Sequence, residues 1–499
     1  MGAPVVALSS DPDTRSGSNR RAKKAKSPPL ENVTRIGTDE VSHRKGLVAT
    51  AIEGWVRRRP ANLAATVSPT PPLGRAVAPA VPEPAPGTSA AELRTLRPRL
   101  RSVGVTGTNG KTTTTCMLAS IVAAAGETSA RATTLGTWLG DEQRSADVSL
   151  DAFGDLVRAA VAQQVRTIAV ETTSKALAAG FARVWPADVA VFTNLTRDHL
   201  DTHGSPEAYL AAKAQLFMTV PPDGAVVWNL ADPCSALLDA LVHPGVRRFG
   251  WVVGDVHPDC AQLPVDLRAD AIHTSVDGTR CEVSASPRSE ALSGSQRLAA
   301  VGAVHVQNAL GAALAAAALG YEAAAIWQGI RAFPGVPGRF ELVARRPLVV
   351  VDYAHTPDAL ARTLLEARAL IDGTAGRLAC VFGCGGERDQ GKRPEMGRIA
   401  DEHAHTVYLT NDNPRREDPE RILDAIEQGA PTPRRAQWHR LPDRHAAIHA
   451  AIASATPGDA VVIAGRGHEQ RQILGGGAVP FSDVGVAHEA VSQRRGGVP

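Results

Sequence analysis

The amino-acid sequence predicts an α/β protein with a central domain built on a mostly parallel sheet and a smaller, Rossmann-like C-terminal domain. Short apolar runs alternate with longer helical stretches between residues 98 and 336. The same alternation resumes between residues 337 and 499, after a cluster of Pro and Gly residues at 334–338 that is typical of a domain boundary. Because strands that alternate with helices pair in parallel under a cover of helices, we expect one such sheet in each domain.

The elements of the central domain follow from its apolar pattern. The apolar runs that predict strands are 102–106, 167–170, 189–193 and 225–229. The stretches that predict helices are 112–125, 153–163, 206–217 and 306–319. Residues 245–300 have shorter strand patterns and few helix signals, so we expect an antiparallel addition to the sheet there.

The C-terminal domain repeats this arrangement on a smaller scale. Its strands are expected at 348–352, 378–382, 406–410 and 460–464, and its helices at 357–370, 394–403, 419–428 and 444–454. Polar clusters follow the strands, at 352–355, 383–389, 411–416 and 465–469. Because ligands of open parallel sheets bind at the carboxyl ends of the strands, these clusters are the expected binding residues.

Residues 1–97 differ from the rest of the chain in composition. They contain a basic run from Arg20 to Lys26 and a stretch rich in Pro and Ala at 69–86. Few of these residues could form an apolar core that offsets the entropy lost on folding, so we expect a disordered or linker segment. A solvated tail is the simpler interpretation of the basic run, and a nucleic-acid contact is the alternative.

Composition and charge argue against several classes of protein. The chain has 54 Lys and Arg against 51 Asp and Glu, a net charge of +3 that gives no support for a nucleic-acid or membrane partner. No apolar run approaches the roughly 18 residues of a transmembrane helix, and we see no signal peptide. The six Cys have no regular spacing, which predicts reduced thiols and a cytoplasmic protein. Cys380 and Cys384 are expected to pack in the core rather than to bind a metal.

The stretch VGVTGTNGKTTTT at 103–115 has the order strand, Gly-rich turn, Lys and helix. Gly107 and Gly110 allow backbone N–H groups to approach phosphate oxygens. Lys111 adds a charge for the β- and γ-phosphates, and the hydroxyl of Thr112 can bind Mg²⁺. The spacing GxxGKT is shorter than the usual GxxxxGKS/T, and a plain Gly-rich turn is the alternative. A Lys-Thr pair at a strand-to-helix turn favours a phosphate loop.

Further polar residues follow other predicted strands. Glu171 ends an apolar run, where its carboxylate could bind Mg²⁺; a surface Glu that caps the next helix is the alternative. The stretch 192–217 places Asp198 and His199 on a turn before a helix that carries Lys213 among Ala residues. Lys213 is either a surface side chain with a buried stem or a positioned cation.

Eight segments match, in order, the motifs of one family. They are GTNGKTT at 107–113, FTNLTRDHLDTHGS at 192–205, AYLAAKAQLF at 208–217, PGRFELV at 337–343, VDYAHTPDAL at 351–360, FGCGGERDQGKRPEMG at 382–397, NDNPRREDP at 411–419 and AGRGHEQ at 464–470. With these motifs, residues from about 100 to 490 resemble the Mur ligases, ATP-dependent amide-bond synthetases of peptidoglycan assembly. Within that family the chain is most similar to the MurE type, which adds the third residue of the peptide.

The resemblance implies roles for individual residues. The implied ATP-binding residues are Gly107, Thr108, Asn109, Gly110, Lys111, Thr112, Thr113, Asn308, Arg339, Asp352 and His355. The implied Mg²⁺ ligands are Thr112, Glu171, His199 and Lys213, the last as a carbamate. The implied amino-acid pocket is Arg388, Asp412, Asn413, Arg415, Gly465 and Glu469, and Ser174 would contact the acceptor. Lys111, Lys213 and His199 would be catalytic.

The resemblance also implies a reaction. A carboxylate of the acceptor attacks the γ-phosphorus of ATP, and the amine of the incoming amino acid then displaces phosphate from the acyl phosphate. In this family the string DNPR, at 412–415 here, indicates meso-diaminopimelate rather than lysine, because its Arg can bind a carboxylate through two hydrogen bonds. The implied cofactors are ATP and Mg²⁺, the implied partners are small molecules only, and we expect a monomer in the cytoplasm.

Departures from the family pattern all concern the acceptor. The family's first domain, which binds the UDP sugar, is not recognisable in residues 1–97. The expected Thr-Thr-Pro reads Val-Ser-Leu-Asp at 148–151, and Glu-Val-Ser-Ser-His reads Glu-Thr-Thr-Ser-Lys at 171–175. Two alternatives therefore stay open. One is a paralogue that uses another carboxylate, such as a folylpolyglutamate-synthase-like ligase, and the other is a nucleotide-binding NTPase without ligase activity.

Overall fold

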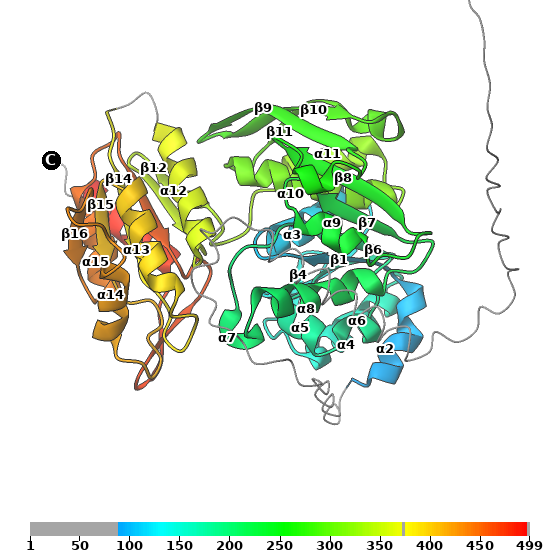
Figure 1. Ribbon diagram of the computed structural model, residues 1–499, viewed down its shortest axis with the longest axis horizontal. Coiled ribbons are helices and arrows are strands. Elements are labelled where there is room, and N and C mark those ends of the chain that lie inside the picture. Colours follow the sequence, from blue (N-terminus) through cyan, green and yellow to red (C-terminus); the bar gives the residue numbers. More distant parts are fainter. Residues whose placement is uncertain (1–87, 372–374, 497–499) are drawn as a thin grey trace, which may run out of the picture. The chain divides into compact units, whose positions relative to one another are not determined.

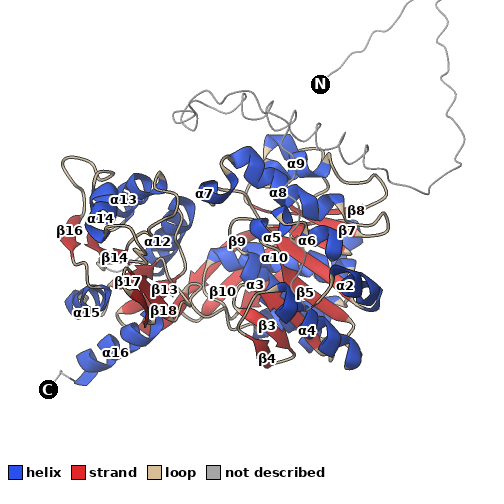
Figure 2. Cartoon of the chain, turned by 90° about the horizontal axis from the view of Figure 1, so that it is seen from below, coloured by secondary structure: helices blue, strands red, loops and turns tan. Residues whose placement is uncertain are grey.

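The computed structural model describes residues 88–371 and 375–496, and these residues confirm the predicted α/β fold. They form an eleven-stranded sheet, a six-stranded sheet and a two-stranded hairpin (Figure 1). Helices and strands alternate along the chain around both larger sheets (Figure 2). In this part of the chain, no helix combines the length and the apolar character needed to cross a bilayer.

The first sheet is mostly parallel. Its strands are β1 (Arg101–Thr106), β2 (Ser129–Thr133), β3 (Gly136–Leu139), β4 (Glu142–Ser145), β5 (Thr167–Glu171), β6 (Val189–Phe192), β7 (Ala225–Asn229), β8 (Arg247–Val253), β9 (Leu267–Ser275), β10 (Gly278–Ala285) and β11 (Gly294–Leu298). They are ordered β11-β10-β9-β8-β7-β6-β1-β5-β2-β3-β4. All neighbours from β9 to β2 pair in parallel, and the pairs beyond them at both edges are antiparallel.

The expectation of an antiparallel addition at 245–300 is therefore right for β10 and β11 but wrong for β8, which extends the parallel part of the sheet. The strands β2 to β4 were not predicted. Their residues alternate less clearly between apolar and polar, and β4 is exposed along most of its length.

Helices cover both faces of the first sheet. They are α3 (Lys111–Ala124), α4 (Leu150–Ala162), α5 (Ser174–Ala178), α6 (Phe181–Val184), α7 (Leu200–His203), α8 (Pro206–Met218), α9 (Cys234–Asp239), α10 (Ala303–Ala318) and α11 (Ala323–Ala332). Val103 and Val105 of β1 pack with α3, α10 and α11 in one core. Ala190 and Phe192 of β6 pack with α8 and α9 in another core. Because the side chains of a strand point alternately to its two faces, the near-continuous apolar runs of these strands are explained by burial on both sides.

The second sheet lies within residues 341–464. Its strands are β12 (Glu341–Arg345), β13 (Leu348–Asp352), β14 (Leu378–Phe382), β15 (Thr406–Leu409), β16 (Gln437–Arg440) and β17 (Ala460–Ala464), ordered β12-β13-β17-β14-β15-β16. All pairs are parallel except β12 with β13. The helices are α12 (Pro357–Ile371), α13 (Lys392–His403), α14 (Pro419–Glu427), α15 (Arg444–Ser454) and α16 (Asp483–Gly496). The first three share one core with the sheet and the last two share another, and Cys380 and Cys384 are buried in the former.

The two ends of this second region can be compared with the sequence predictions. The Pro and Gly cluster at 334–338 lies between the last helix of the first region and β12, as a boundary segment would. After β17, the chain adds the hairpin of β18 (Arg471–Leu474) and β19 (Gly477–Pro480) before α16, and neither the hairpin nor α16 was expected.

The expectation that residues 1–97 are disordered is wrong for their last part, and residues 1–87 lie outside the described residues. Helix α2 (Ala90–Leu96) begins after Ser89, whose hydroxyl accepts a hydrogen bond from the backbone of Glu92. Leu93 is completely buried among apolar residues of α4 and β5. Arg97 donates to the carbonyl of Pro186 over 2.5 Å. A single buried Leu in a seven-residue helix is too weak a pattern to recognise beside a Pro-rich stretch.

Candidate active site

The turn between β1 and α3 forms the loop that the sequence predicts for phosphate. Gly110 has φ of 85° and precedes the first turn of α3, and a Cβ atom there would lie 2.3 Å from Oδ1 of Asn308. The backbone N–H of Thr108 donates to the carbonyl of Asn194 over 2.8 Å, and that of Asn109 donates to its side-chain oxygen over 2.9 Å. The loop is therefore held by the segment after β6, with the N-terminus of a 14-residue helix behind it.

Lys111 and Thr112 lie at the start of α3. The Lys111 ammonium donates to the carbonyl of Thr108 over 2.8 Å, folding the side chain back over the loop. Burial lowers the pKa of Lys111, and the negative charge of Glu171 opposes that shift. The Thr112 hydroxyl donates to Oε2 of Glu171 over 2.9 Å, and the backbone N–H of Thr134 donates to the same oxygen over 2.9 Å. A hydroxyl and a carboxylate, both ligand types that Mg²⁺ prefers, thus meet beside the loop.

Lys213 is almost completely buried on α8, with 1% of its surface exposed. Its ammonium donates to the carbonyl of Gly107 over 2.6 Å and lies 4.3 Å from the ring centre of Tyr209. Burial and the nearby charge of Lys111 hold the pKa of Lys213 well below its usual range. Of the two interpretations left by the sequence, the burial therefore favours a positioned amino group over a surface side chain.

Asp198 and His199 follow β6 on the turn before α7. Nε2 of His199 lies 3.4 Å from Asp198, and Nε2 of His355 lies 3.7 Å from the same carboxylate. Burial by itself would raise the pKa of Asp198, but the contact with His355 and the charge of His199 bring it well below its usual range. Burial lowers the pKa of His199 to about 4, although Asp198 opposes this. The pair therefore combines a carboxylate and an imidazole that both have lowered pKa values.

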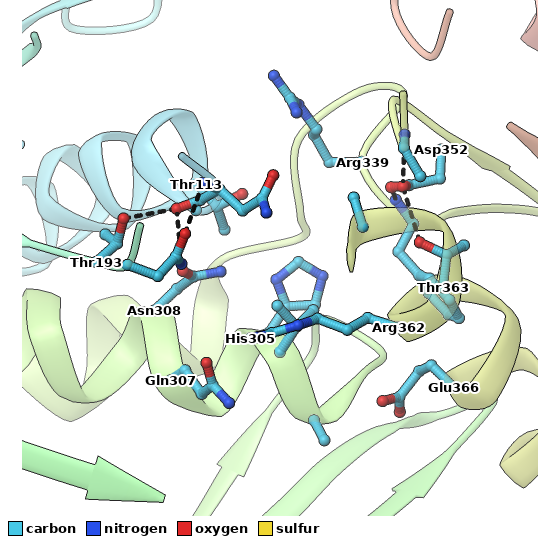
Figure 3. A pocket seen from close by; sticks show the side chains of 18 of the residues that line it. Thr113, Thr193, His305, Gln307, Asn308, Arg339, Asp352, Arg362, Thr363 and Glu366 are labelled. Atoms are coloured by element: carbon cyan, nitrogen blue, oxygen red, sulfur yellow. Dashed lines mark hydrogen bonds between the residues drawn. The ribbon is translucent and has the colours of Figure 1, made fainter. Parts of the chain in front are cut away.

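A cavity of about 490 Å³ adjoins the phosphate loop. It is lined by six predicted ATP-binding residues of the loop and by others, including Asn308, Arg339 and Asp352. Asn308 lies beside the loop and Asp352 lies across the cavity from it (Figure 3). Arg339 reaches the loop, with its guanidinium 3.5 Å from the Thr112 hydroxyl. The Arg339 guanidinium lies over the Tyr353 ring, 4.3 Å from its centre. Burial raises the pKa of Asp352, whose carboxylate accepts the backbone N–H of Phe340 over 2.6 Å.

The far end of this cavity contains residues that the sequence reasoning missed. His305, Arg362 and Glu366 all line it (Figure 3). His305 is buried, which lowers its pKa to about 4. Arg362 and Glu366 lie on one face of α12, within a stretch that had been predicted only as a helix. His305 lies in the first turn of α10, one residue before the stretch predicted as that helix. A helix pattern gives no signal that particular polar side chains point into a cavity.

A second cavity, of about 130 Å³, contains the whole predicted amino-acid pocket. Its lining includes Arg388, Asp412, Asn413, Arg415, Gly465 and Glu469, together with Asp198, His199, His355 and Lys392. His355, implied by the resemblance to contact ATP, thus lines this cavity beside Asp198. Lys392, which the sequence reasoning did not single out, is buried and donates to the carbonyl of His355 over 2.7 Å.

The polar groups of the second cavity are held in place by one another. The Asn413 amide donates to Glu469 over 2.7 Å, and the Arg415 guanidinium donates to the carbonyl of Gly386 over 2.8 Å. Burial raises the pKa of Glu469, and the charge of Asp412 raises it further. The cavity therefore presents guanidinium donors and carboxylate acceptors to the same small space. Such a set matches a ligand that carries both ammonium and carboxylate groups.

Ion pairs and hydrogen bonds connect the segment 194–201 to the residues around the second cavity. The Arg197 guanidinium donates to Asp389 over 3.0 Å, and Arg388 lies 3.5 Å from Asp201. Asp198 and His199 line the second cavity and lie between Arg197 and Asp201 in the sequence. The residues expected to act on phosphate and those expected to bind the amino acid thus meet at one place.

The residues that the resemblance relates to the acceptor make hydrogen bonds to other residues of the chain. Ser174, the predicted acceptor contact, is buried, and its hydroxyl lies 3.0 Å from Nε2 of His203. At the departure from the family pattern, Ser149 caps α4 by accepting from Ala152, and Asp151 accepts the backbone N–H of Thr88 over 2.6 Å. The 148–151 segment is thereby joined to the start of the described chain.

The comparisons with known proteins agree with the predicted family. Residues 105–316 match the family model described as the Mur ligase middle domain, and residues 338–467 match the model described as the Mur ligase, glutamate ligase domain. The enzyme UDP-N-acetylmuramoyl-L-alanyl-D-glutamate–2,6-diaminopimelate ligase of Trichormus variabilis is 39% identical over 405 residues, which cover 79% of this chain and 78% of that protein.

The similarity also extends before the described residues. The protein of the same name from Thermosynechococcus vestitus is 40% identical over 467 residues, covering 90% of each chain. A match of that extent includes part of the segment before Thr88. We expected no recognisable family pattern in residues 1–97, and this expectation is wrong for part of that segment.

Solved structures give the same assignment of the fold. A structure of a UDP-N-acetylmuramoyl-L-alanyl-D-glutamate–2,6-diaminopimelate ligase is 31% identical, with a TM-score of 0.56 over 81% of this chain and 82% of that one. A structure of E. coli FolC in complex with DHPP and ADP has a TM-score of 0.58 at 23% identity, covering 81% and 92% of the two chains. The latter likeness extends to the fold alone.

The contact between Gly110 and Asn308 leads to a test of the phosphate loop. Gly110→Ala is expected to weaken ATP binding at least tenfold, because its Cβ would displace Asn308 from the loop and the positive φ would be strained. Isothermal titration calorimetry with a non-hydrolysable ATP analogue measures this affinity.

Gly126→Ala is the matched control for that substitution. Gly126 has a similar φ of 78°, but nothing lies within 4 Å of the added Cβ. The control carries the same kind of backbone strain without the collision, so its ATP affinity should stay within twofold of the wild type. Equal losses in both variants would show that general destabilisation, and not the loop, explains the effect.

Proposed function

The chain belongs to the Mur ligase family, and we propose that it adds meso-diaminopimelate to UDP-N-acetylmuramoyl-L-Ala-D-Glu in peptidoglycan synthesis. It is an ATP-dependent acid–amino-acid ligase of that family. The relatives at 39% and 40% identity carry the name of this reaction, and this supports the choice of substrates.

One structural observation carries the proposal. The second cavity combines the guanidinium groups of Arg388 and Arg415 with the carboxylates of Asp412 and Glu469, and Asp198 lines the same cavity. An amino acid with two ammonium and two carboxylate groups could pair with all four of these side chains. A simple NTPase has no use for such a cavity beside its phosphate loop.

The first step proposed is the attack of the acceptor carboxylate on the γ-phosphorus of ATP. Lys111, at the N-terminus of α3, would neutralise charge on the transferred phosphoryl group, and the loop N–H groups would orient it. In the structure the Lys111 ammonium donates a hydrogen bond to the carbonyl of Thr108 over 2.8 Å. We propose that bound phosphate replaces that carbonyl as the partner of the ammonium.

Mg²⁺ is proposed as the cofactor, and the residues beside the loop fit it. The Thr112 hydroxyl and the Glu171 carboxylate are 2.9 Å apart, and both are buried side chains with oxygen donors. They would hold the ion, with His199 and Lys213 as the further ligands implied by the resemblance. When bound, Mg²⁺ supplies positive charge that stabilises the phosphates during transfer.

The second step proposed is the attack of the amine on the acyl phosphate, with release of phosphate. The second cavity would bind the amino acid so that its amine faces Asp198 and His199, which also lie beside the phosphate loop. The Arg197–Asp389 and Arg388–Asp201 contacts would keep the two regions together during the reaction. Excluding water there protects the acyl phosphate from hydrolysis.

We further propose that Lys213 acts as a carbamate. Burial and the charge of Lys111 lower the pKa of its amine, and only the neutral amine reacts with CO₂. The carbamate would place an anion, rather than an amine, next to the Lys111 ammonium. It would attract that ammonium and supply a carboxylate for Mg²⁺.

The location, oligomeric state and partners of the enzyme stay predictions. We propose that it works in the cytoplasm as a monomer on small-molecule substrates, without a nucleic-acid or membrane partner. The near-neutral charge balance and the small cavities are consistent with this proposal.

The direct test of the proposed reaction measures ADP release by the purified protein with ATP and Mg²⁺. Release is expected only when UDP-N-acetylmuramoyl-L-Ala-D-Glu and meso-diaminopimelate are both present, because the amine is needed to consume the acyl phosphate. Mass spectrometry of the product should detect the tripeptide. ADP release with either substrate alone would favour an NTPase. If ATP binds without any release, the acceptor is a different carboxylate.

Replacing Arg415 tests the assignment of the amino-acid pocket. Arg415→Ala should raise KM for meso-diaminopimelate by about 10- to 100-fold, since a charge-assisted hydrogen bond contributes about 1.5–3 kcal/mol. KM for ATP should stay unchanged. The exposed neighbour provides a control, Arg416→Ala, which should leave both constants at their wild-type values. A rise in KM for ATP in the Arg415 variant would contradict the assignment.

Replacing Lys213 tests the carbamate. Protein incubated with ¹³C-bicarbonate should give a carbamate signal in its ¹³C NMR spectrum, and Lys213→Ala should lack that signal and lose activity by 100-fold or more. Short carboxylic acids should restore part of the activity by supplying the missing carboxylate. Lys175→Ala removes an exposed Lys and should keep the signal. Persistence of the signal in the Lys213 variant would contradict the proposal.

A further inference from the structure

A cluster of metal-ligating side chains lies outside both cavities, between helices α15 and α16. It consists of His445 and His449 on α15 and Glu489 on α16. Their ligand atoms all lie within 4.8 Å of one another. Among the described residues, these three are the His, Cys, Asp or Glu side chains that lie close enough together to hold a metal ion. We propose that these three residues bind a transition-metal ion, with Zn²⁺ as the chemical type.

The geometry of the three side chains suits such an ion. His445 and His449 are four residues apart, so both project from the same face of α15. Their rings are stacked with centres 4.3 Å apart. Nε2 of His445 lies 3.5 Å from one oxygen of Glu489, and Nε2 of His449 lies 4.0 Å from the other. Ligands about 2.0–2.2 Å from a tetrahedral Zn²⁺ are separated by about 3.4 Å, so small side-chain rotations complete the site.

The backbones that carry these side chains are fixed on both sides of the cluster. At one end, Arg444 and Asp483 form a completely buried ion pair with two hydrogen bonds of 2.7 Å. At the other end, the Arg494 guanidinium donates to the carbonyl of Ile452 over 2.7 Å. Between these anchors, apolar residues of both helices pack in one core. The two helices therefore present the ligands in nearly the bound arrangement.

An unpaired nitrogen atom in the cluster also indicates a ligand. Nε2 of His449 is shielded from solvent but has no hydrogen-bond partner in the structure. The Glu489 carboxylate accepts a hydrogen bond from Gln493 over 3.0 Å, which orients it. Two imidazoles and one carboxylate favour Zn²⁺, Cu²⁺ or Ni²⁺ over Mg²⁺, which prefers oxygen ligands. Three protein ligands on a partly exposed surface leave a fourth position for water.

The site is separate from the ligase reaction. None of its three residues lines either cavity. A bound ion would instead connect the last described helix to α15, and its effect would be on the stability of the C-terminal region. Since an ion that binds only the folded chain stabilises it, Zn²⁺ should raise the melting temperature.

The test uses full-length protein without a His tag, freed of metal by EDTA and returned to buffer with excess Mg²⁺, which occupies the oxygen-rich sites. Zn²⁺ binding is measured by isothermal titration calorimetry, and Co²⁺ binding by its visible absorption. Wild type should bind one more equivalent at low micromolar Zn²⁺ than His449→Gln, and only wild type should show the Co²⁺ absorption of a site with nitrogen ligands.

His488→Gln is the matched control, because His488 is an exposed residue of α16 that is not a member of the cluster. It should keep the extra equivalent and the rise in melting temperature with Zn²⁺. Glu489→Gln provides a second variant, which should bind at least tenfold more weakly and retain the ATP affinity of the wild type. Equal Zn²⁺ stoichiometry in wild type and His449→Gln, or binding only at millimolar Zn²⁺, would overturn the proposal.

Discussion

The parallel pairing of β5, β1 and β6 is the constraint on which the site depends. Val105 pairs with Glu171 and Thr106 pairs with Phe192, so all three strands end at the same edge of the sheet. The phosphate loop leaves β1 at that edge, Glu171 ends β5 there, and the segment that holds the loop leaves β6 there. A shift of register by one residue would turn the Glu171 side chain to the opposite face and separate it from Thr112.

Burying two Lys side chains at this edge of the sheet opposes folding, and nearby polar and charged groups offset that cost. Lys111 and Lys213 lie close enough to affect each other's charge, and both lose hydration on burial. Each ammonium donates to a loop carbonyl, and Glu171 and Asp198 supply the opposite charge. An uncompensated buried charge would cost several kcal/mol, so the hydrogen bonds and counter-charges are part of what keeps this loop folded.

The sequence predicted most of the buried parallel core, because unbroken apolar runs such as those of β7 and β14 leave little ambiguity. It did not predict α2, whose only strong signal is Leu93, or β4, which is mostly exposed. The predicted phosphate-loop and amino-acid-pocket residues, which follow strands in short motifs, gather around two cavities in the structure. His305 and Lys392 were missed because they lie just before the stretches predicted as helices, where neither a strand end nor an apolar pattern marks a polar side chain as facing a cavity.

The arrangement of Arg415 bears on the choice between two possible amino acids. Its guanidinium donates to two backbone carbonyls, those of Gly386 and Asn413, which fix the side chain at the cavity. A fixed guanidinium attracts a second carboxylate and repels the ammonium at the end of a lysine side chain. Because the two amino acids differ only in that carboxylate, one positioned Arg can both favour meso-diaminopimelate and reject lysine. Specificity then follows from attraction and repulsion at one residue, with no need for a difference in pocket size.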